Sequence, residues 1–167
     1  EYVSGCLAMV HGADVNKALT AGLLHDCAKC MSADEKIARC KKHGLPISKV
    51  ELANPELLHA KLGAFYAREK YGVDDEDILS AIEFHTTGRP AMSLLEKIVF
   101  VADYIEPNRK PLPEIEEIRR ETFTDIDVSI VHILKNTLSY LDSGNCGDTD
   151  EMSIRTYNYY TSLNSED

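Results

Sequence analysis

The chain has 167 residues, 44% of them hydrophobic and 28% charged, which suits one globular domain with a buried core. Its formal net charge of −10 argues against a general nucleic-acid or membrane-surface partner, because both need an excess of cations. No stretch approaches the ~20 apolar residues of a membrane span, and the N-terminus lacks the basic and then apolar pattern of a signal peptide. We therefore expect a cytoplasmic location.

Apolar residues recur at helical spacing, and no run of alternating apolar residues predicts a strand. The first predicted helix covers residues 1–10, so the sequence opens within a helix. Asp14 is suited to cap a second helix that continues through Cys30. The serine and glutamate of residues 32–35 predict a capping box for a third helix, which ends near residues 43–44.

The remaining chain continues as helices separated by Pro, Gly and Asp. Residues 46–54 are predicted to form a connector with at most a helical turn, and residues 110–113 and 144–150 to form loops. Further helices are predicted over residues 55–71, 74–85, 93–105, 115–121, 125–141 and 152–163. The expected fold is all-α, with seven to nine helices packed as one domain over residues 1–167.

The five cysteines are odd in number and irregularly spaced, which favours free thiols over a disulfide framework. One pattern offers an alternative, because Cys27-x-x-Cys30 followed by Cys40-x-x-His43 has the spacing of a four-ligand zinc site. The first pair lies within a predicted helix, without the turn residues that shape a zinc knuckle. We therefore expect core or surface thiols, with the zinc site as the minor alternative.

Four predicted segments carry polar residues that are unfavourable in an apolar core unless they converge: His25-Asp26, His59, His85 and Asp103. Asp103 lies in the most apolar predicted helix, where an unpaired ionised carboxylate would cost several kcal/mol. Each residue alone also fits a surface, capping or hydrogen-bonded core position. Together they favour a metal site that suits iron, manganese or zinc, in which two metal ions could share Asp26.

Three cations follow these segments closely in sequence. Lys29 comes after the His-Asp pair, Arg89 after His85 and Arg109 after Asp103. In an acidic protein, this placement favours a substrate with phosphate oxygens. The alternative is that long basic side chains simply occupy helix ends, where the helix dipole favours them.

Four motifs in this order resemble the HD-domain superfamily, and more narrowly the bacterial YqeK-type family of symmetrical diadenosine tetraphosphate hydrolases. The motifs are Leu-Leu-His-Asp-Cys-Ala-Lys (residues 23–29), Pro-Glu-Leu-Leu-His-Ala-Lys-Leu-Gly-Ala (55–64), Ile-Glu-Phe-His-Thr-Thr-Gly-Arg (82–89) and Val-Ala-Asp-Tyr-Ile-Glu-Pro-Asn-Arg (101–109). The resemblance covers residues 12–109. It implies an all-helical domain with a two-metal centre, most commonly of iron.

The resemblance also implies roles for individual residues. His25, Asp26 and Asp103 would hold the first metal, and His59, His85 and a bridging Asp26 the second. The residues expected near the polyphosphate are Lys29, Thr86, Gly88, Arg89 and Arg109. The family has one more histidine ligand on the opening helix, a few residues before the position of Glu1. We therefore expect the N-terminal helix of this sequence to be incomplete, with first-metal affinity dependent on that histidine.

The expected activity is metal-dependent hydrolysis of diadenosine tetraphosphate into two ADP by a metal-bound hydroxide, with Asp26 and Lys29 as catalytic residues. Two alternatives remain open: an HD phosphohydrolase for another nucleotide, or a non-catalytic nucleotide- or metal-sensing module. The expected partner is a small nucleotide, without nucleic acid or membrane. A homodimer, the native metal and the physiological substrate are left open.

Overall fold

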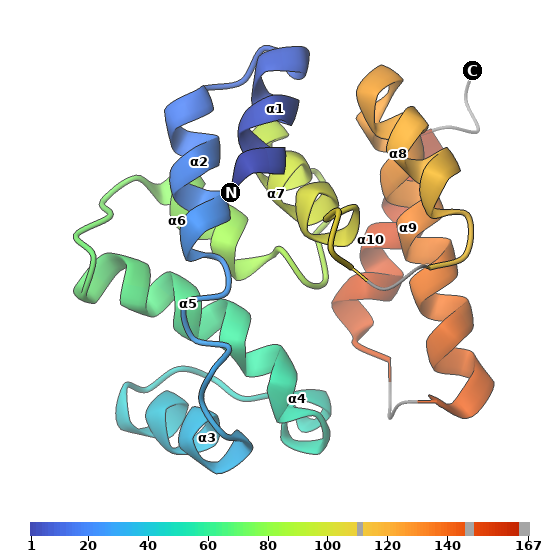
Figure 1. Cartoon of the computed structure of the whole chain (residues 1–167). Helices are drawn as coiled ribbons and strands as arrows, with labels where there is room; N and C mark the ends of the chain where they lie inside the picture. The colour runs from blue at the N-terminus through green and yellow to red at the C-terminus, as the bar shows by residue number, and fades with distance from the viewer. Residues whose placement is uncertain (110–111, 146–148, 164–167) are drawn as a thin grey trace.

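The computed structural model of the chain describes residues 1–109, 112–145 and 149–163. Every regular element in these residues is helical (Figure 1). The α-helices are α1 (Tyr2–His11), α2 (Val15–Leu24), α3 (Ala33–Lys42), α4 (Lys49–Ala53), α5 (Leu58–Glu69), α6 (Glu76–Glu83), α7 (Leu94–Tyr104), α8 (Ile115–Thr124), α9 (Ile126–Tyr140) and α10 (Glu151–Leu163). A 3-10 helix, η1 (Pro55–Leu57), precedes α5, and a π-helical segment, η2 (Leu141–Asn145), follows α9.

The all-α fold is as predicted. The described residues form ten α-helices, and the one beyond the expected range is α4, which lies in the predicted connector. Both predicted loops lie partly outside the described residues, at 110–111 and 146–148. Within the described ranges, no helix combines the length and apolar character needed to cross a membrane.

Capping residues begin several helices where the sequence predicts them. The Asp14 carboxylate accepts from two backbone N–H groups at the start of α2, and Asp75 and Asp125 do the same for α6 and α9. Ser32 and Glu35 form the predicted capping box of α3. These side chains satisfy N–H groups that a helix start leaves without intrahelical partners.

The predicted C-terminal end of the second helix is wrong. Helix α2 ends at Leu24 rather than Cys30, and residues 25–30 form successive turns. In these turns Cys27 N donates to Leu24 O and Lys29 N donates to Asp26 O, each at a three-residue spacing. The turns lie against α5, where a Cβ atom on Gly63 would lie 3.1 Å from the His25 carbonyl oxygen. The small residue therefore permits this close approach of backbone to helix.

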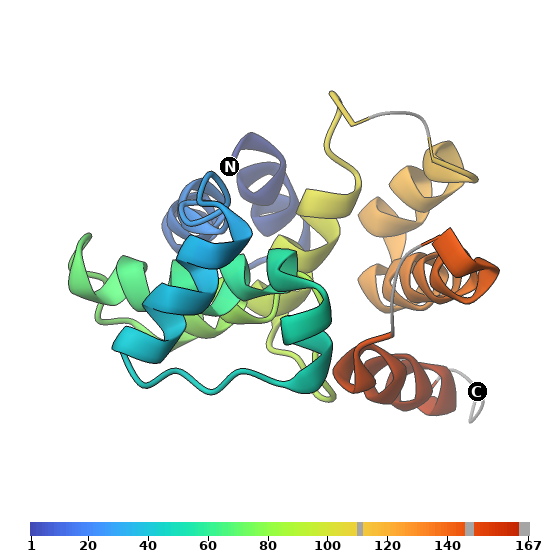
Figure 2. The same cartoon turned by 90° about the horizontal axis from the view of Figure 1, so that it is seen from below.

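Helix α7 joins the two sides of the molecule. It packs against α1, α2 and α6 on one side and against α9 on the other (Figure 1). The view from below shows α8, α9 and α10 grouped on that second side (Figure 2). The apolar residues of α7, such as Ile98, Val99 and Val101, are buried in the main core. This packing fixes the end of α7 opposite the turns that follow α2.

Candidate metal centre

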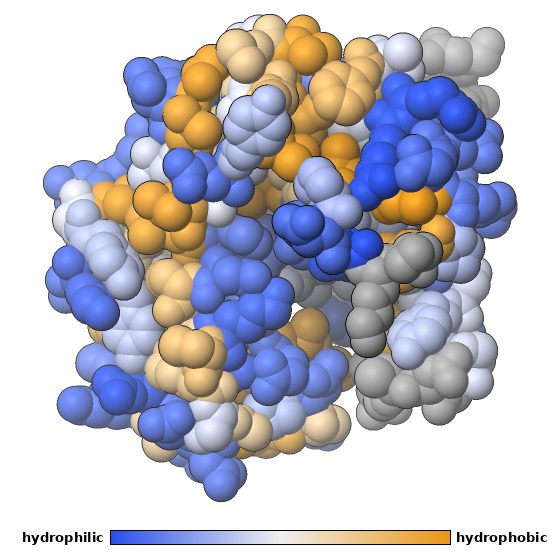
Figure 3. Space-filling view, in the orientation of Figure 1, coloured by the Kyte–Doolittle hydropathy of each residue, from blue (hydrophilic) through white to orange (hydrophobic). Residues whose placement is uncertain are grey.

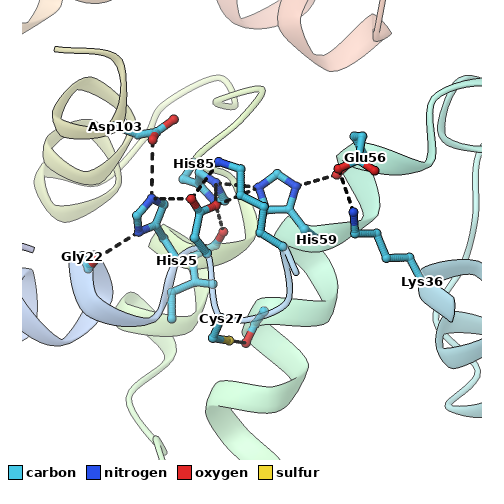
Figure 4. Close-up of polar contacts among 12 residues, drawn as sticks. Gly22, His25, Cys27, Lys36, Glu56, His59, His85 and Asp103 are labelled. Atoms are coloured by element: carbon cyan, nitrogen blue, oxygen red, sulfur yellow. Dashed lines mark hydrogen bonds and ion pairs between the residues drawn. The ribbon is translucent and has the colours of Figure 1, made fainter. Parts of the chain in front are cut away.

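The residues of the four predicted segments converge. His25 and Asp26 directly follow α2, His59 lies in the first turn of α5, His85 follows α6, and Asp103 lies in the last turn of α7. Figure 4 shows the three imidazole rings pointing toward one another, with Asp103 beside His25. The cluster therefore joins segments far apart in sequence.

Each histidine ring is oriented by a backbone carbonyl three residues earlier. Nδ1 of His25 lies 2.9 Å from Gly22 O, and Nδ1 of His85 lies 2.7 Å from Ile82 O. Nδ1 of His59 makes the corresponding short contact with Glu56 O. A carbonyl oxygen only accepts, so each Nδ1 carries the hydrogen and Nε2 of the neutral ring carries a lone pair.

These Nε2 lone pairs face one another and the Asp26 carboxylate. Nε2 of His59 lies 3.0 Å from Nε2 of His85 and 3.2 Å from Oδ1 of Asp26. Asp26 Oδ1 is buried and, within the described part of the chain, receives no hydrogen bond. Acceptors at this separation repel unless a proton or a cation lies among them.

The two oxygens of Asp26 face different partners. Oδ1 points toward His59 and, at 3.7 Å, toward Nε2 of His85. Oδ2 lies 3.5 Å from Nε2 of His25, which in turn lies 3.4 Å from Oδ1 of Asp103. The Asp26 carboxylate thus lies between two groups of residues. His59 and His85 form the His-His side, and His25 and Asp103 form the His-Asp side.

The donor set fits a metal ion. One ligand atom from each of His25, Asp26 and His85 lies within 4.8 Å of the other two. Neutral imidazoles and ionised carboxylates are the ligands that iron, manganese and zinc accept. A cation in this position would also neutralise the facing lone pairs and supply the partner that Asp26 Oδ1 lacks.

The electrostatics keep both carboxylates ionised. Burial alone would raise the pKa of Asp26, but that pKa lies well below its usual range, and the hydrogen bond from the Lys29 ammonium group is among the interactions that lower it. Burial likewise opposes ionisation of Asp103, but its pKa is lowered overall, and the Arg109 guanidinium that donates to it favours the ionised form. Ionised carboxylates are the form that binds a metal ion.

Two of the predicted cations lie at the cluster. Lys29 Nζ donates to Asp26 Oδ2 at 2.7 Å, and the lysine side chain is 51% exposed. Arg109 Nη2 donates to Asp103 Oδ2 at 3.3 Å. Figure 3 shows hydrophilic side chains gathered in front of the turns after α2 and beside the end of α7. A charged substrate would therefore meet polar groups on this face.

The segment after His85 has other contacts. Arg89 Nε donates to the buried Glu96 carboxylate at 2.7 Å. Gly88 has a φ of 62°, and a Cβ there would lie 2.9 Å from Thr156 of α10. Thr86 borders a separate cavity of about 210 Å³. Contacts of these three residues with a polyphosphate remain a prediction.

The zinc-site alternative is wrong, because its four residues lie in different surroundings. Cys27 Sγ donates to Gly63 O, Cys30 is exposed, and Cys40 is buried in an apolar cluster. The His43 ring packs on Phe65 instead. The four cysteines among the described residues are free, as predicted; the fifth lies outside the described residues.

A cavity of about 290 Å³ lies beside the cluster. His25 and Asp103 form part of its wall, together with residues 1–4 and the segment after α7. The further histidine ligand implied by the resemblance would precede Glu1, so it stays a prediction.

Sequence reasoning missed the three carbonyls that orient the rings, because a carbonyl has no residue-type signal.

Comparisons with known proteins place the sequence among described relatives. The sequence matches the HD domain family model over residues 1–108. The "Bis(5'-nucleosyl)-tetraphosphatase, symmetrical" of Halalkalibacterium halodurans is 47% identical over 135 residues, which cover 81% of this chain and 71% of that protein. The protein of the same name from Bacillus subtilis is 44% identical over 135 residues, covering 81% of this chain and 72% of that protein.

A solved structure is also similar. The crystal structure of a predicted HD superfamily hydrolase involved in NAD metabolism, from Clostridium acetobutylicum, superimposes with a TM-score of 0.90. The two sequences are 40% identical, and the match covers 96% of this chain and 84% of that one.

Proposed function

The chain belongs to the HD-domain family, and we propose that it is a metal-dependent phosphohydrolase that cleaves diadenosine tetraphosphate symmetrically into two molecules of ADP. The observation that carries the proposal is the convergence of three Nε2 lone pairs on the Asp26 carboxylate. The relatives' names supply the substrate. HD-domain membership implies divalent metal binding.

We propose two metal positions that share Asp26. The two oxygens of Asp26 point toward different partners, which supports this arrangement. His25 and Asp103 would complete one metal position, and His59 and His85 the other. Iron is the proposed metal, and the mixed nitrogen and oxygen ligands also suit manganese or zinc. Bound metal ions would supply Lewis-acid activation of water and of the phosphoryl group.

The chain's own cations would position and neutralise the polyphosphate. Lys29 is held by Asp26 and is half exposed, so its ammonium group can donate to a phosphate oxygen without leaving the cluster. Arg109 is held by Asp103, and its guanidinium lies 5.5 Å from the centre of the Tyr104 ring. In this proposal, the two cations would offset the negative charge that develops when a tetraphosphate is split.

A substrate panel tests the proposal. Chain stripped of metal and then reloaded with iron or manganese is incubated with diadenosine tetraphosphate, mononucleotides and a cyclic dinucleotide. We expect turnover of diadenosine tetraphosphate only after metal addition. Turnover confined to another nucleotide would contradict the substrate, and tight nucleotide binding without turnover would favour a sensing module.

A further inference from the structure

The carbonyl that orients His59 differs from the other two in its support. Gly22 and Ile82 lie in the last turns of α2 and α6, where the helical backbone sets the direction of their carbonyls. Glu56 lies in η1, a 3-10 turn of three residues that leads directly into α5 and whose N-cap makes no side-chain hydrogen bond. A short 3-10 turn is a weak support by itself. The orientation of His59 therefore depends on what holds this turn.

A buried lysine from another helix holds it. Lys36 lies on the buried face of α3 and is 0% exposed, and its Nζ donates to Oε2 of Glu56 at 2.7 Å (Figure 4). The Glu56 side chain is 64% exposed. Close to this pair, Leu58 at the start of α5 packs in an apolar cluster with Cys40 of α3. The ion pair thus connects α3 to the residue whose carbonyl accepts from His59.

Burial of the Lys36 ammonium group does not by itself stabilise the fold. Desolvation of a lysine is costly, and its attraction to a carboxylate offsets that cost only where the geometry is good. A charge at this site is therefore better explained by the geometry that it imposes. This geometry consists of the distance between α3 and η1 and, through the Glu56 carbonyl, the direction of the His59 ring.

We infer that Lys36 is a positioning residue for His59: through Glu56 it fixes the ring so that Nε2 points at Asp26. In the proposed function, on which this inference rests, His59 would be a ligand at the His-His side of the cluster. Loss of an outer partner of a metal ligand typically lowers metal affinity by about 10–100-fold. We expect the pair Lys36–Glu56 to act on metal affinity in this way.

The test compares three variants of the full chain. Lys36→Met/Glu56→Gln removes both charges, keeps an unbranched apolar side chain in place of the lysine stem, retains the Glu56 carbonyl, and leaves no buried charge unpaired. Glu56→Gln alone changes an exposed side chain and serves if the double variant does not fold. Lys97→Met is the matched control, because Lys97 also joins two helices through an ion pair, to Asp127. Within the described part of the chain, the hydrogen bond, ion pair and ring contact of Lys97 are with Asp127 and Tyr160, not with a histidine of the cluster.

Two readouts separate positioning from general stability. The first is hydrogen exchange of the His59 Nδ1–H by NMR in metal-free chain, assigned with His59→Gln. The second is affinity for Co²⁺ alone, followed by its visible absorption. We expect the double variant to exchange at least about tenfold faster and to bind Co²⁺ about tenfold more weakly, with Lys97→Met unchanged in both.

Equal exchange and equal Co²⁺ affinity in the double variant and the wild type would overturn the inference. So would faster exchange without a loss of affinity, or the same losses in Lys97→Met. If the wild-type chain bound no Co²⁺, the proposed function would fail instead. The exchange measurement would then decide the positioning role alone.

Discussion

Around the Asp26 carboxylate, the histidine side chains offer hydrogen-bond acceptors where the carboxylate oxygens need donors or a cation. The three histidines use Nδ1 to donate to backbone carbonyls, so each Nε2 of a neutral ring has only a lone pair to offer. A lone pair cannot satisfy a carboxylate oxygen. The cluster is therefore arranged for a cation.

Asp26→Asn tests this residue directly. The amide is neutral and has one acceptor oxygen in place of two, so it cannot serve both sides of the cluster. We expect metal affinity to fall by more than the roughly 10–100-fold typical of an outer partner, and turnover to be lost. Metal titration of the purified variant measures the first effect, and product formation the second.

The matched control is Asp34→Asn, the same change at an exposed position in the first turn of α3. It should bind metal as the wild type does. Asp26→Asn that kept wild-type affinity would argue against a ligand role for Asp26.

The five cluster residues could be predicted from sequence, because a histidine or carboxylate among apolar residues needs a partner. Arg89 shows the limit of that reasoning. Its sequence position after His85 resembles that of Lys29 after Asp26, but it pairs with buried Glu96. That partner lies seven residues away on α7, so only the packing of the segment against α7 reveals it.

At the scale of elements, helix starts were predictable and one helix end was not. Asp14 and Ser32 supply local hydrogen bonds that sequence alone specifies. The end of α2 at Leu24 depends instead on the approach of α5 at Gly63. Apolar periodicity continues past that point, so it predicts a longer helix than the tertiary contact allows.

His132, a histidine outside the cluster, joins helix α9 to helix α8 and the residue before it. His132 Nδ1 lies 2.9 Å from Glu121 Oε2, and Nε2 lies 2.9 Å from Glu114 Oε2. Burial alone would lower the pKa of His132, but the two glutamates raise it above its ordinary value of 6.5. The charged form is therefore favoured in the folded chain.

This pKa shift predicts a pH-dependent stability. Because the folded pKa is the higher one, His132 contributes fully below pH 6.5 and loses its contribution as pH rises through the folded pKa. The free energy of unfolding of the wild type should exceed that of His132→Gln most at low pH. Urea unfolding from about pH 5.5 to 8.5 measures the difference. A difference that grows with pH would contradict the assignment.

At the scale of the whole molecule, the cluster joins segments that pack around α7. Ligand groups follow α2 and α6, begin α5 and end α7, so a bound ion would link elements from both ends of the matched domain. The all-α class followed from helical periodicity. The side-by-side placement of these ends did not, because it depends on how the helices pack.

Metal should therefore stabilise the whole fold. A ligand at 100 times its Kd adds about 2.7 kcal/mol to the free energy of unfolding, for one site that the unfolded chain lacks. We expect a shift of about this size on metal addition, reversed by a chelator, in denaturant titrations. Asp26→Asn should show little shift. An equal shift in that variant would place the bound metal elsewhere.

With metal at the Asp26 cluster, water should split diadenosine tetraphosphate at its centre. Mass spectrometry of the products formed by metal-loaded chain in ¹⁸O-labelled water tests it most directly. ADP should be the sole nucleotide product, formed only with metal, and half of the ADP molecules should carry one ¹⁸O. AMP and ATP as products, or ADP formed equally by chelated chain, would contradict the claim.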